Sequence, residues 1–389
     1  MTWHFFHCQP RLVWIAVLAT AVTLFAASLR ADSLVSVAQQ HEKLVKWGHA
    51  ALEGGQSPRA AGYFAQALQL APADVATQLA MAEAFARQGQ VRKAEAFLRH
   101  LLREPAQSTN APLYLRALSQ LQKRYPFVAS GNFAFLPSTN ISNAPSESSF
   151  QTLLGRFEID KGGDQISGTG VALGAEGKYR QPLAEGLSFE IGAALNYVWY
   201  DKPSLRYWRG RVSVDVARLT VSNEVRGGLH IDQITYPLAT GKTSDRVAKG
   251  AYVAWSRAMG NGAWLGLKAL AEYRRYPDKQ ALSGPYATIG ASWLIRQKSG
   301  PRLLFSGSLE RSKPELNYHR YLGGTVRTGY ERNLSDTLRA GISGDATLRV
   351  YDREFAAVDY ARRDDIYRVG LSVSDSRLKV FGATPKLTC

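Results

Sequence analysis

The feature that most constrains the fold is a period of two in side-chain polarity, which begins at Phe127 and runs to the end of the chain. Between Leu187 and Trp199 every second residue is apolar, and the segments 263–275 and 367–374 repeat the pattern. Successive side chains of a β-strand point to opposite faces, so each segment has one apolar and one polar face. The polar face holds Glu190, Lys268, Glu272, Arg274 and Arg368.

These alternating segments are longer than the strands of about five or six residues that are usual in soluble sheets. An apolar face opposite a charged one is typical of a membrane barrel, whose strands face lipid on one side and a polar lumen on the other. The pattern therefore predicts an antiparallel transmembrane β-barrel over residues 126–389, with the charged residues lining the lumen. A soluble β-sandwich is the alternative.

The connections between the strands alternate in length. Short turns are expected at 182–186, near 217–219, at 259–262, 298–301 and 333–336, and near 375–377. Longer polar stretches lie at 137–166, 201–204, 236–247, 276–284, 312–317 and 351–364. Outer-membrane barrels have short periplasmic turns and longer outside loops. Because the first strand, Phe127–Phe135, runs into a long connection, we expect it and whatever precedes it to start in the periplasm.

The strand count is twelve complete strands and part of a thirteenth, Lys379–Cys389. An open sheet edge is not tolerated in lipid, and bacterial barrels of this kind have an even number of strands. The expectation is a barrel of about 14 strands, of which about 12–13 are present, incomplete at its C-terminal end.

Residues 38–124 are expected to be helical, with a repeat of 34 residues that aligns His41 with Val75. The repeat pairs small residues with small and large with large, at 48/82, 60/94 and 64/98, and places Trp47 and Met81 at a shared core position. This resembles the tetratricopeptide repeat, a helix–turn–helix unit of that length. A plain helical hairpin is the alternative. The expected fold class is thus α+β multidomain. The groove of the repeats would be lined by His49, Leu52, Leu79, Glu83 and Ala86.

The N-terminus carries the one long apolar run, 12–29, after a short basic segment and before small residues. It predicts a secretory signal peptide over residues 1–31, an uncleaved anchor being the alternative. The chain has a formal net charge of +16. No nucleic-acid motif accompanies this charge, so we expect a basic lumen or rim facing anionic lipid or polypeptide and no nucleic-acid partner.

Motifs of catalysis are missing. The seven histidines lack metal-ligand spacing, and there is neither a Gly-x-Ser-x-Gly elbow nor a P-loop. The glycines of 168–174 are interpreted as strand glycines rather than a dinucleotide loop. We therefore expect no enzyme activity, no metal and no cofactor.

Three segments together carry a resemblance to a known family. They are NFAFLPSTNISNAPS at 132–146, RDDIYRVGLS at 363–372 and FGATPKL at 381–387. With the signal peptide and the repeats, their order resembles the surface lipoprotein assembly modulator family (Slam), over nearly the whole mature chain. This chain stops just after its Thr-Pro-Lys-Leu segment, where the family continues.

The resemblance implies a 14-stranded outer-membrane barrel that helps to move lipoproteins or secreted partner proteins to the cell surface. Its expected partners are that client, outer-membrane lipid and the barrel-assembly machinery, and its N-terminal domain would lie in the periplasm. The loop motif Asn140, Ser142 and Asn143 would order the first strand or touch the client, unless it only holds a surface loop through Asx turns. The alternatives are a polysaccharide-export or general outer-membrane porin with a periplasmic repeat domain, and an outer-membrane enzyme.

Overall fold

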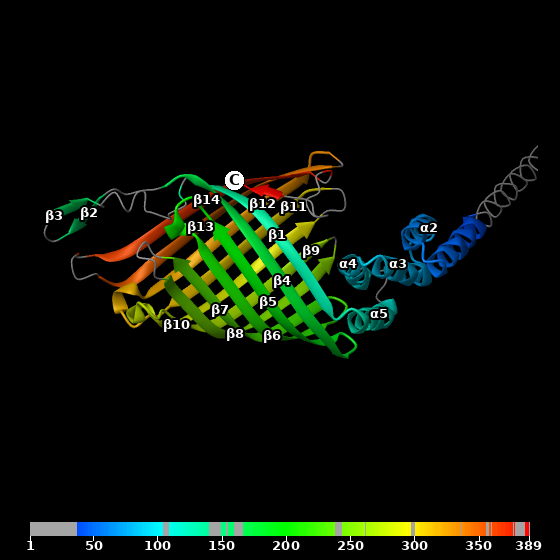
Figure 1. Ribbon diagram of the computed structural model, residues 1–389, viewed down its shortest axis with the longest axis horizontal. Helices are drawn as coiled ribbons and strands as arrows, with labels where there is room; N and C mark the ends of the chain where they lie inside the picture. Colours follow the sequence, from blue (N-terminus) through cyan, green and yellow to red (C-terminus); the bar gives the residue numbers. More distant parts are fainter. Residues whose placement is uncertain are drawn as a thin grey trace, which may run out of the picture. The chain divides into compact units, whose positions relative to one another are not determined.

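The computed structural model describes residues 37–103, 109–138, 140, 149–152, 155–158, 166–237, 243–260, 262–296, 300–335, 337–354, 358, 360–375, 377 and 386–388. The expected signal peptide lies outside these ranges. The described chain forms helices first and then one long antiparallel sheet (Figure 1). Two compact units divide at Arg99 and His100. No helix within the described ranges is long and apolar enough to cross a membrane.

The helices occupy residues 37–53, α2 (Ser57–Leu70), α3 (Val75–Arg87), α4 (Val91–Arg103) and α5 (Ala111–Arg124). Local sequence sets their limits. Pro58 stands in the first turn of α2, where its missing N–H costs no hydrogen bond. Asp74 caps α3 by accepting hydrogen bonds from the backbone N–H of Ala76 and Thr77, both at 3.3 Å. Gly55 and Gly89, with φ of +73°, end the helices that precede them.

The first unit has a small apolar core built on the predicted repeat positions. Phe64 and Ala60 of α2 are fully buried, as is Ala94 of α4, and Leu98 is 2% exposed. A Cβ on Gly48 would lie 2.4 Å from the Phe64 ring, so only glycine lets the first helix approach α2 this closely. The prediction for Trp47 was wrong. It is 52% exposed and lies against Tyr63 with ring centroids 5.8 Å apart, because it projects from the outer side of its helix.

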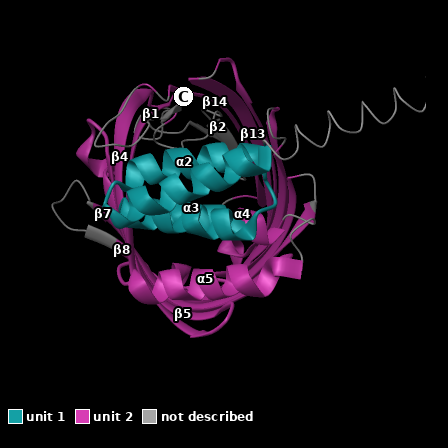
Figure 2. Ribbon diagram, turned by 90° about the vertical axis from the view of Figure 1, so that its right-hand side faces the viewer, with its two compact units in different colours: residues 1–99 teal, residues 100–389 magenta. Residues whose placement is uncertain are grey.

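In the part of the chain that the structure describes, the barrel has twelve long strands, each paired with its neighbours in chain order. They are β1 (Phe127–Ser138), β4 (Gly168–Ala184), β5 (Leu187–Trp199), β6 (Tyr207–Leu219), β7 (Asn223–Pro237), β8 (Thr243–Gly260), β9 (Ala263–Arg275), β10 (Gly284–Arg296), β11 (Arg302–Ser312), β12 (Tyr321–Asn333), β13 (Leu338–Glu354) and β14 (Ala361–Asp375). The strands are inclined and curve round into a ring (Figure 2). This confirms the predicted architecture and nearly the predicted strand number.

The ring is not closed by a continuous ladder in the described chain. The three residues of β15 (Lys386–Thr388) pair with β14 at Ser372–Ser374 and lie near β1 without joining its ladder. A β-strand presents hydrogen-bonding groups along both edges, so the outer edge of β1 is an unpaired edge over the described residues.

The connections alternate in length as the sequence indicates. Residues 185–186 join β4 to β5, while 276–283 join β9 to β10 and include the short helix η4 (Gln280–Leu282). Similar single turns, η3 (Pro203–Leu205) and η5 (Asn317–His319), lie in two other long connections. The expected loop 137–166 also contains a hairpin, β2 (Ser149–Thr152) and β3 (Gly155–Glu158), which the sequence analysis did not foresee. Its strands are only four residues long, too short for a clear alternation.

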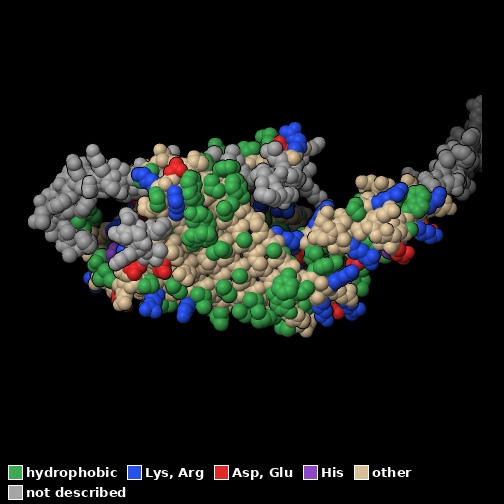
Figure 3. Space-filling view, viewed as in Figure 1, with side chains coloured by type: hydrophobic (Ala, Val, Ile, Leu, Met, Phe, Trp, Pro, Cys, Tyr) green, Lys and Arg blue, Asp and Glu red, His purple; other side chains and the backbone are tan. Residues whose placement is uncertain are grey.

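The two faces of the sheet differ as predicted. On the outer face large apolar side chains are exposed, including Ile191, Leu229, Ile289 and Val369. Figure 3 shows such apolar side chains over the middle of the outer surface and charged ones toward its ends. On the inner face the side chains are charged or small. The helices bury their apolar side chains in a core, as soluble proteins do, whereas the barrel exposes its apolar side chains on its outer face.

The last helix belongs to the barrel unit by its contacts. Arg116 of α5 forms an ion pair of 2.9 Å with Glu185 in the β4–β5 turn, and Leu115 lies near Gly186 of the same turn. At the end of α4, the Arg103 guanidinium lies 3.8 Å from the centre of the Trp264 ring of β9. The compact units therefore divide earlier than residue 125, the boundary expected between helices and barrel.

Candidate functional site: the charged inner wall of the barrel

The inner wall of the barrel is the face of the sheet opposite the exposed apolar side chains. Two of its carboxylates are only 2% exposed, and the first is Glu190 of β5. Glu190 accepts hydrogen bonds from both terminal nitrogens of Arg226 on β7, and the Lys178 ammonium of β4 lies 3.7 Å away. A buried carboxylate is costly unless it is paired and hydrogen-bonded, and here two cations surround it.

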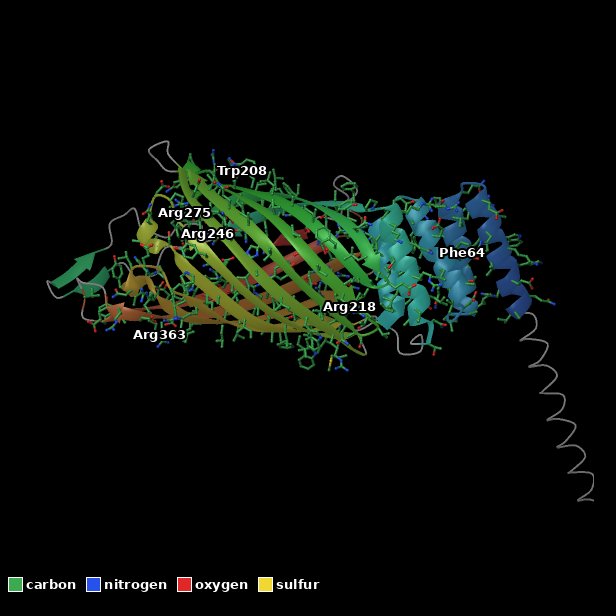
Figure 4. All side chains as sticks on the ribbon, turned by 90° about the horizontal axis from the view of Figure 1, so that it is seen from below. Phe64, Trp208, Arg218, Arg246, Arg275 and Arg363 are labelled. Carbon is green, nitrogen blue, oxygen red and sulfur yellow. The ribbon has the colours of Figure 1, made fainter. Side chains whose placement is uncertain are left out.

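A second cluster surrounds Asp232 of β7, also 2% exposed. Arg209 of β6 and Arg246 of β8 contact its two carboxylate oxygens at 2.8 and 2.7 Å. One buried carboxylate thereby joins three consecutive strands. Figure 4 labels Arg246 on its strand.

The predicted lumenal residues Glu272 and Arg274 belong to a third cluster. Both lie on β9, and Arg274 donates to Glu272 at 2.7 Å. His230 of β7 contacts the other oxygen of Glu272 at 3.0 Å. The Arg274 guanidinium also lies 3.2 Å from the centre of the Tyr286 ring of β10. Lys268 lies four residues before Glu272 on the same face of β9. Its ammonium nitrogen is 5.4 Å from the centre of the Tyr252 ring of β8.

The chain of contacts continues across the later strands. Glu310 of β11 accepts hydrogen bonds from the Tyr286 hydroxyl at 2.6 Å and from Arg349 of β13 at 2.8 Å. Arg368 of β14, the remaining predicted lumenal residue, pairs with Asp345 of β13 at 3.1 Å. All five predicted residues thus stand on the inner wall, in separate clusters rather than in one site.

Several of these bonds pass over a strand that lies between their partners, and a small residue makes this possible. His230 and Glu272 meet across β8 at Gly250, where a Cβ would lie 2.5 Å from the Cβ of Glu272. Arg349 and Glu310 meet across Gly323 of β12, where a Cβ would lie 3.0 Å from Glu310. Glycine therefore lets charged side chains lie flat along the wall and bind second-neighbour strands.

The partners that complete these clusters were not among the residues predicted from the sequence. They are Lys178, Arg209, Arg226, His230, Asp232, Arg246, Glu310, Asp345 and Arg349. Each occupies an inward position of a strand with a period of two, so the signal was present in the segments between those examined. Which carboxylate meets which cation depends on strand register, and this the pattern does not specify.

The five predicted groove residues of the repeats belong to the first unit and lie in or near its core. Leu52 and Ala86 are buried, at 6% and 1% exposure, so they pack between helices. His49 is exposed and its ring meets the edge of Phe64 at 5.3 Å. Leu79 and Glu83 are partly exposed, and Glu83 binds Arg87 at 2.8 Å. Of the five, only His49, Leu79 and Glu83 are accessible at the surface.

The loop motif is described only at its first residue. The backbone N–H of Asn140 donates to the Ser138 hydroxyl at 3.1 Å, which is a turn held by a local side chain. Ser142 and Asn143 lie outside the described residues.

In the long connection after β11, burial lowers the pKa of His319 below its ordinary value, with the positive charge of Arg362 as the second cause. No group of three or more His, Cys, Asp or Glu side chains suited to a metal ion occurs within the described ranges.

The family model of the surface lipoprotein assembly modifiers matches residues 128–389, from the second residue of β1 through β15. This chain belongs to that family. A tetratricopeptide-repeat model matches residues 51–121 and so includes α5, which contacts the barrel. Both resemblances found in the sequence are confirmed. No curated protein matches the chain.

Solved structures similar to this surface lipoprotein assembly modifier are barrels of low sequence identity. A NanC porin is 13% identical, with 63% of this chain and 97% of the porin covered and a TM-score of 0.32. A KdgM porin is 10% identical, with 63% and 97% covered and a TM-score of 0.30. A FadL homologue of Pseudomonas aeruginosa is 9% identical, with 74% and 84% covered and a TM-score of 0.33. The family membership and the apolar outer face make the chain an outer-membrane protein with a role in surface lipoprotein assembly.

Proposed function

We propose that this barrel is a translocation factor that delivers lipoproteins, or secreted partner proteins, to the cell surface. The observation that carries the proposal is the family match over residues 128–389. The inner wall supports it. Its two best-buried carboxylates are already paired, Glu190 with Arg226 and Asp232 with Arg209 and Arg246. A wall of satisfied charges is wettable and offers a polypeptide few strong single contacts that would retain it.

We further propose that residues 38–124 stand in the periplasm and hold the client before export. The short turns, such as 185–186, lie at the end of the barrel where α5 is attached by Arg116. Short turns face the periplasm in barrels of known orientation. His49, Leu79 and Glu83 are the candidate client contacts, since Leu52 and Ala86 are buried.

The proposed partners are the client, outer-membrane lipid and the barrel-assembly machinery that inserts the strands. The proposal assigns no catalytic step to the chain. The charged pairs of the inner wall serve as ion-pair networks, which are common without catalysis.

The test is to express the full chain with a candidate client lipoprotein and to stain intact cells with an antibody against that lipoprotein. Permeabilised cells measure its total amount. We expect surface staining only when the chain is present, and a loss of staining in the charge-reversed variant H49E/E83R if the groove holds the client. Equal surface staining with and without the chain would exclude the proposed function.

A matched pair of variants separates transport from folding. Gly250→Ala places a methyl group against Glu272, whereas a Cβ at Gly210 meets nothing within 4 Å. Gly210→Ala should keep full surface staining, and Gly250→Ala should reduce it in proportion to the loss of folded barrel on a gel.

A further inference from the structure

The outer face of the barrel carries an apolar groove that crosses five strands, from β8 to β12. It has a volume of about 620 Å³. Its floor consists of alanines that are paired in register, and its sides are larger apolar residues, which are 51–60% exposed. The floor residues are Ala251, Ala269, Ala271 and Ala287, and the sides are Val253, Ile289, Leu309 and Leu322. At about 4.8 Å per strand, its length is about 19 Å.

The position of the groove along the strands sets its direction. It begins at Ala251, near the middle of β8 (Thr243–Gly260), and ends at Leu322, the second residue of β12 (Tyr321–Asn333). Across the strands the groove therefore runs from the middle of the barrel wall on β8 to the end with the long connections on β12.

Two exposed cations stand beside the β8 and β9 part of the groove, on the side of the long connections. Lys249 precedes Ala251 by two residues on the same face of β8, and Tyr273, which is 51% exposed, lies opposite it on β9. Arg275 is the last residue of β9, again on this face. Figure 4 places Arg275 at the same end of the barrel as Trp208 and far from Arg218.

These cations differ from Arg311, the basic residue that lines the groove itself. Within the described chain, neither Lys249 nor Arg275 forms an ion pair, whereas Arg311 of the groove is bound by both oxygens of Asp352. A cation on the lipid-facing side of a strand costs up to about 2–4 kcal/mol at the middle of the membrane and less near its surface. An anionic headgroup placed there would offset that cost.

We propose that the groove binds one anionic, phosphate-bearing membrane lipid, with an acyl chain over the alanines of β8 and β9 and its phosphate between Lys249 and Arg275. The Tyr273 ring lies at the level of the headgroup, as aromatic residues do at membrane interfaces. The neutral lipid anchor of a client is a less favourable occupant of the groove, because it would leave both cations unpaired. The site is thus independent of the proposed translocation.

The test measures lipid retention by native mass spectrometry of the full chain in detergent, with dioleoyl phosphatidylglycerol and dioleoyl phosphatidylcholine as probes. These lipids have the same chains and differ in net charge. We expect preferential retention of phosphatidylglycerol. In K249Q/R275Q its affinity should fall about 30-fold, which corresponds to about 1 kcal/mol for each cation. A251L/A271L should fill the groove and weaken both lipids alike.

Two control variants place the same changes elsewhere on the outer face. Arg257→Gln removes a cation at the other end of β8, and Ala193→Leu enlarges an outward alanine of β5. Both should retain lipid as the unmodified chain does, and a gel shift on heating shows that each variant is a folded barrel. Unchanged retention in K249Q/R275Q, or an equal loss in Arg257→Gln, would overturn the proposal. So would a neutral triacylated lipopeptide that displaces phosphatidylglycerol and binds K249Q/R275Q equally well.

Discussion

In both the helical repeats and the barrel wall, a glycine makes room for a large neighbouring side chain. That side chain is apolar in the repeats and charged in the wall. Under Phe64, Gly48 leaves room for an aromatic ring in an apolar core. Under the His230–Glu272 pair, Gly250 leaves room for charges that reach over a strand. In water a helix pair must hide its apolar side, whereas a barrel in lipid must hide its polar side. Close packing is therefore needed in both units, with apolar contacts in one and ion pairs in the other.

The comparison is tested most strongly in the apolar core. Phe64→Ala removes a fully buried ring, so we expect the free energy of unfolding of the helical unit to fall by about 3 to 5 kcal/mol. Denaturant unfolding of the full chain, followed by circular dichroism at 222 nm, measures this. Trp47→Ala, at a 52% exposed position, is the control and should cost less than half as much. Equal losses would mean that Phe64 is not the centre of the core.

The corresponding test in the barrel removes a partner of one of its two best-buried carboxylates. Arg226→Ala leaves Glu190, which is 2% exposed, with Lys178 as its remaining cation. We expect a loss of about 3 kcal/mol, at the low end for a broken buried pair because Lys178 stays. The temperature at which the heated barrel changes its gel mobility reports the loss.

The double variant E190Q/R226M is the control for that experiment. It removes both charges, so it should be more stable than Arg226→Ala alone. A double variant that is less stable than the single one would show that the ion pair itself, rather than the avoidance of a lone buried charge, stabilises the wall.

Gly250→Ala tests the shared role of glycine directly. The new methyl group would lie 2.4 Å from the carbonyl oxygen of Ala271, so strand or side chains must move, at a cost of about 1 to 3 kcal/mol. Gly210→Ala, in open space, should change the gel-shift temperature little. If the two variants behave alike, the small residue is not what lets His230 and Glu272 meet.

The smallest expected effect concerns a single helix end. Asp74→Ala removes two hydrogen bonds to the first turn of α3 and should cost about 1 kcal/mol. Gln56→Ala, at the start of α2, is the matched control because the Gln56 side chain makes no capping hydrogen bond. Unfolding at 222 nm should separate the two variants, and the barrel's gel shift should respond to neither.

Much of the candidate site could be predicted from local pattern. The alternation from Leu187 to Trp199 placed Glu190 on the charged face, and the same reasoning placed Lys268, Glu272, Arg274 and Arg368. Their partners could not be predicted from the sequence, because Arg226 lies two strands away from Glu190 and the pairing of the two residues depends on strand register. Leu52 and Ala86 show the opposite error. The helical period shows which side of a helix is apolar, but it does not distinguish the lining of a binding groove from the core between helices.

The sequence by itself determined the two architectures and their order along the chain, since the strand period of two and the 34-residue repeat are both visible in the order of the residues. Three sequence motifs carried the family resemblance. Only the tertiary structure decided how the charges pair across strands, that α5 is attached to the β4–β5 turn, and that alanines of three strands meet in one outer groove with two cations beside it. Each of these results depends on side chains distant in sequence being brought together by register and curvature, which no local pattern records.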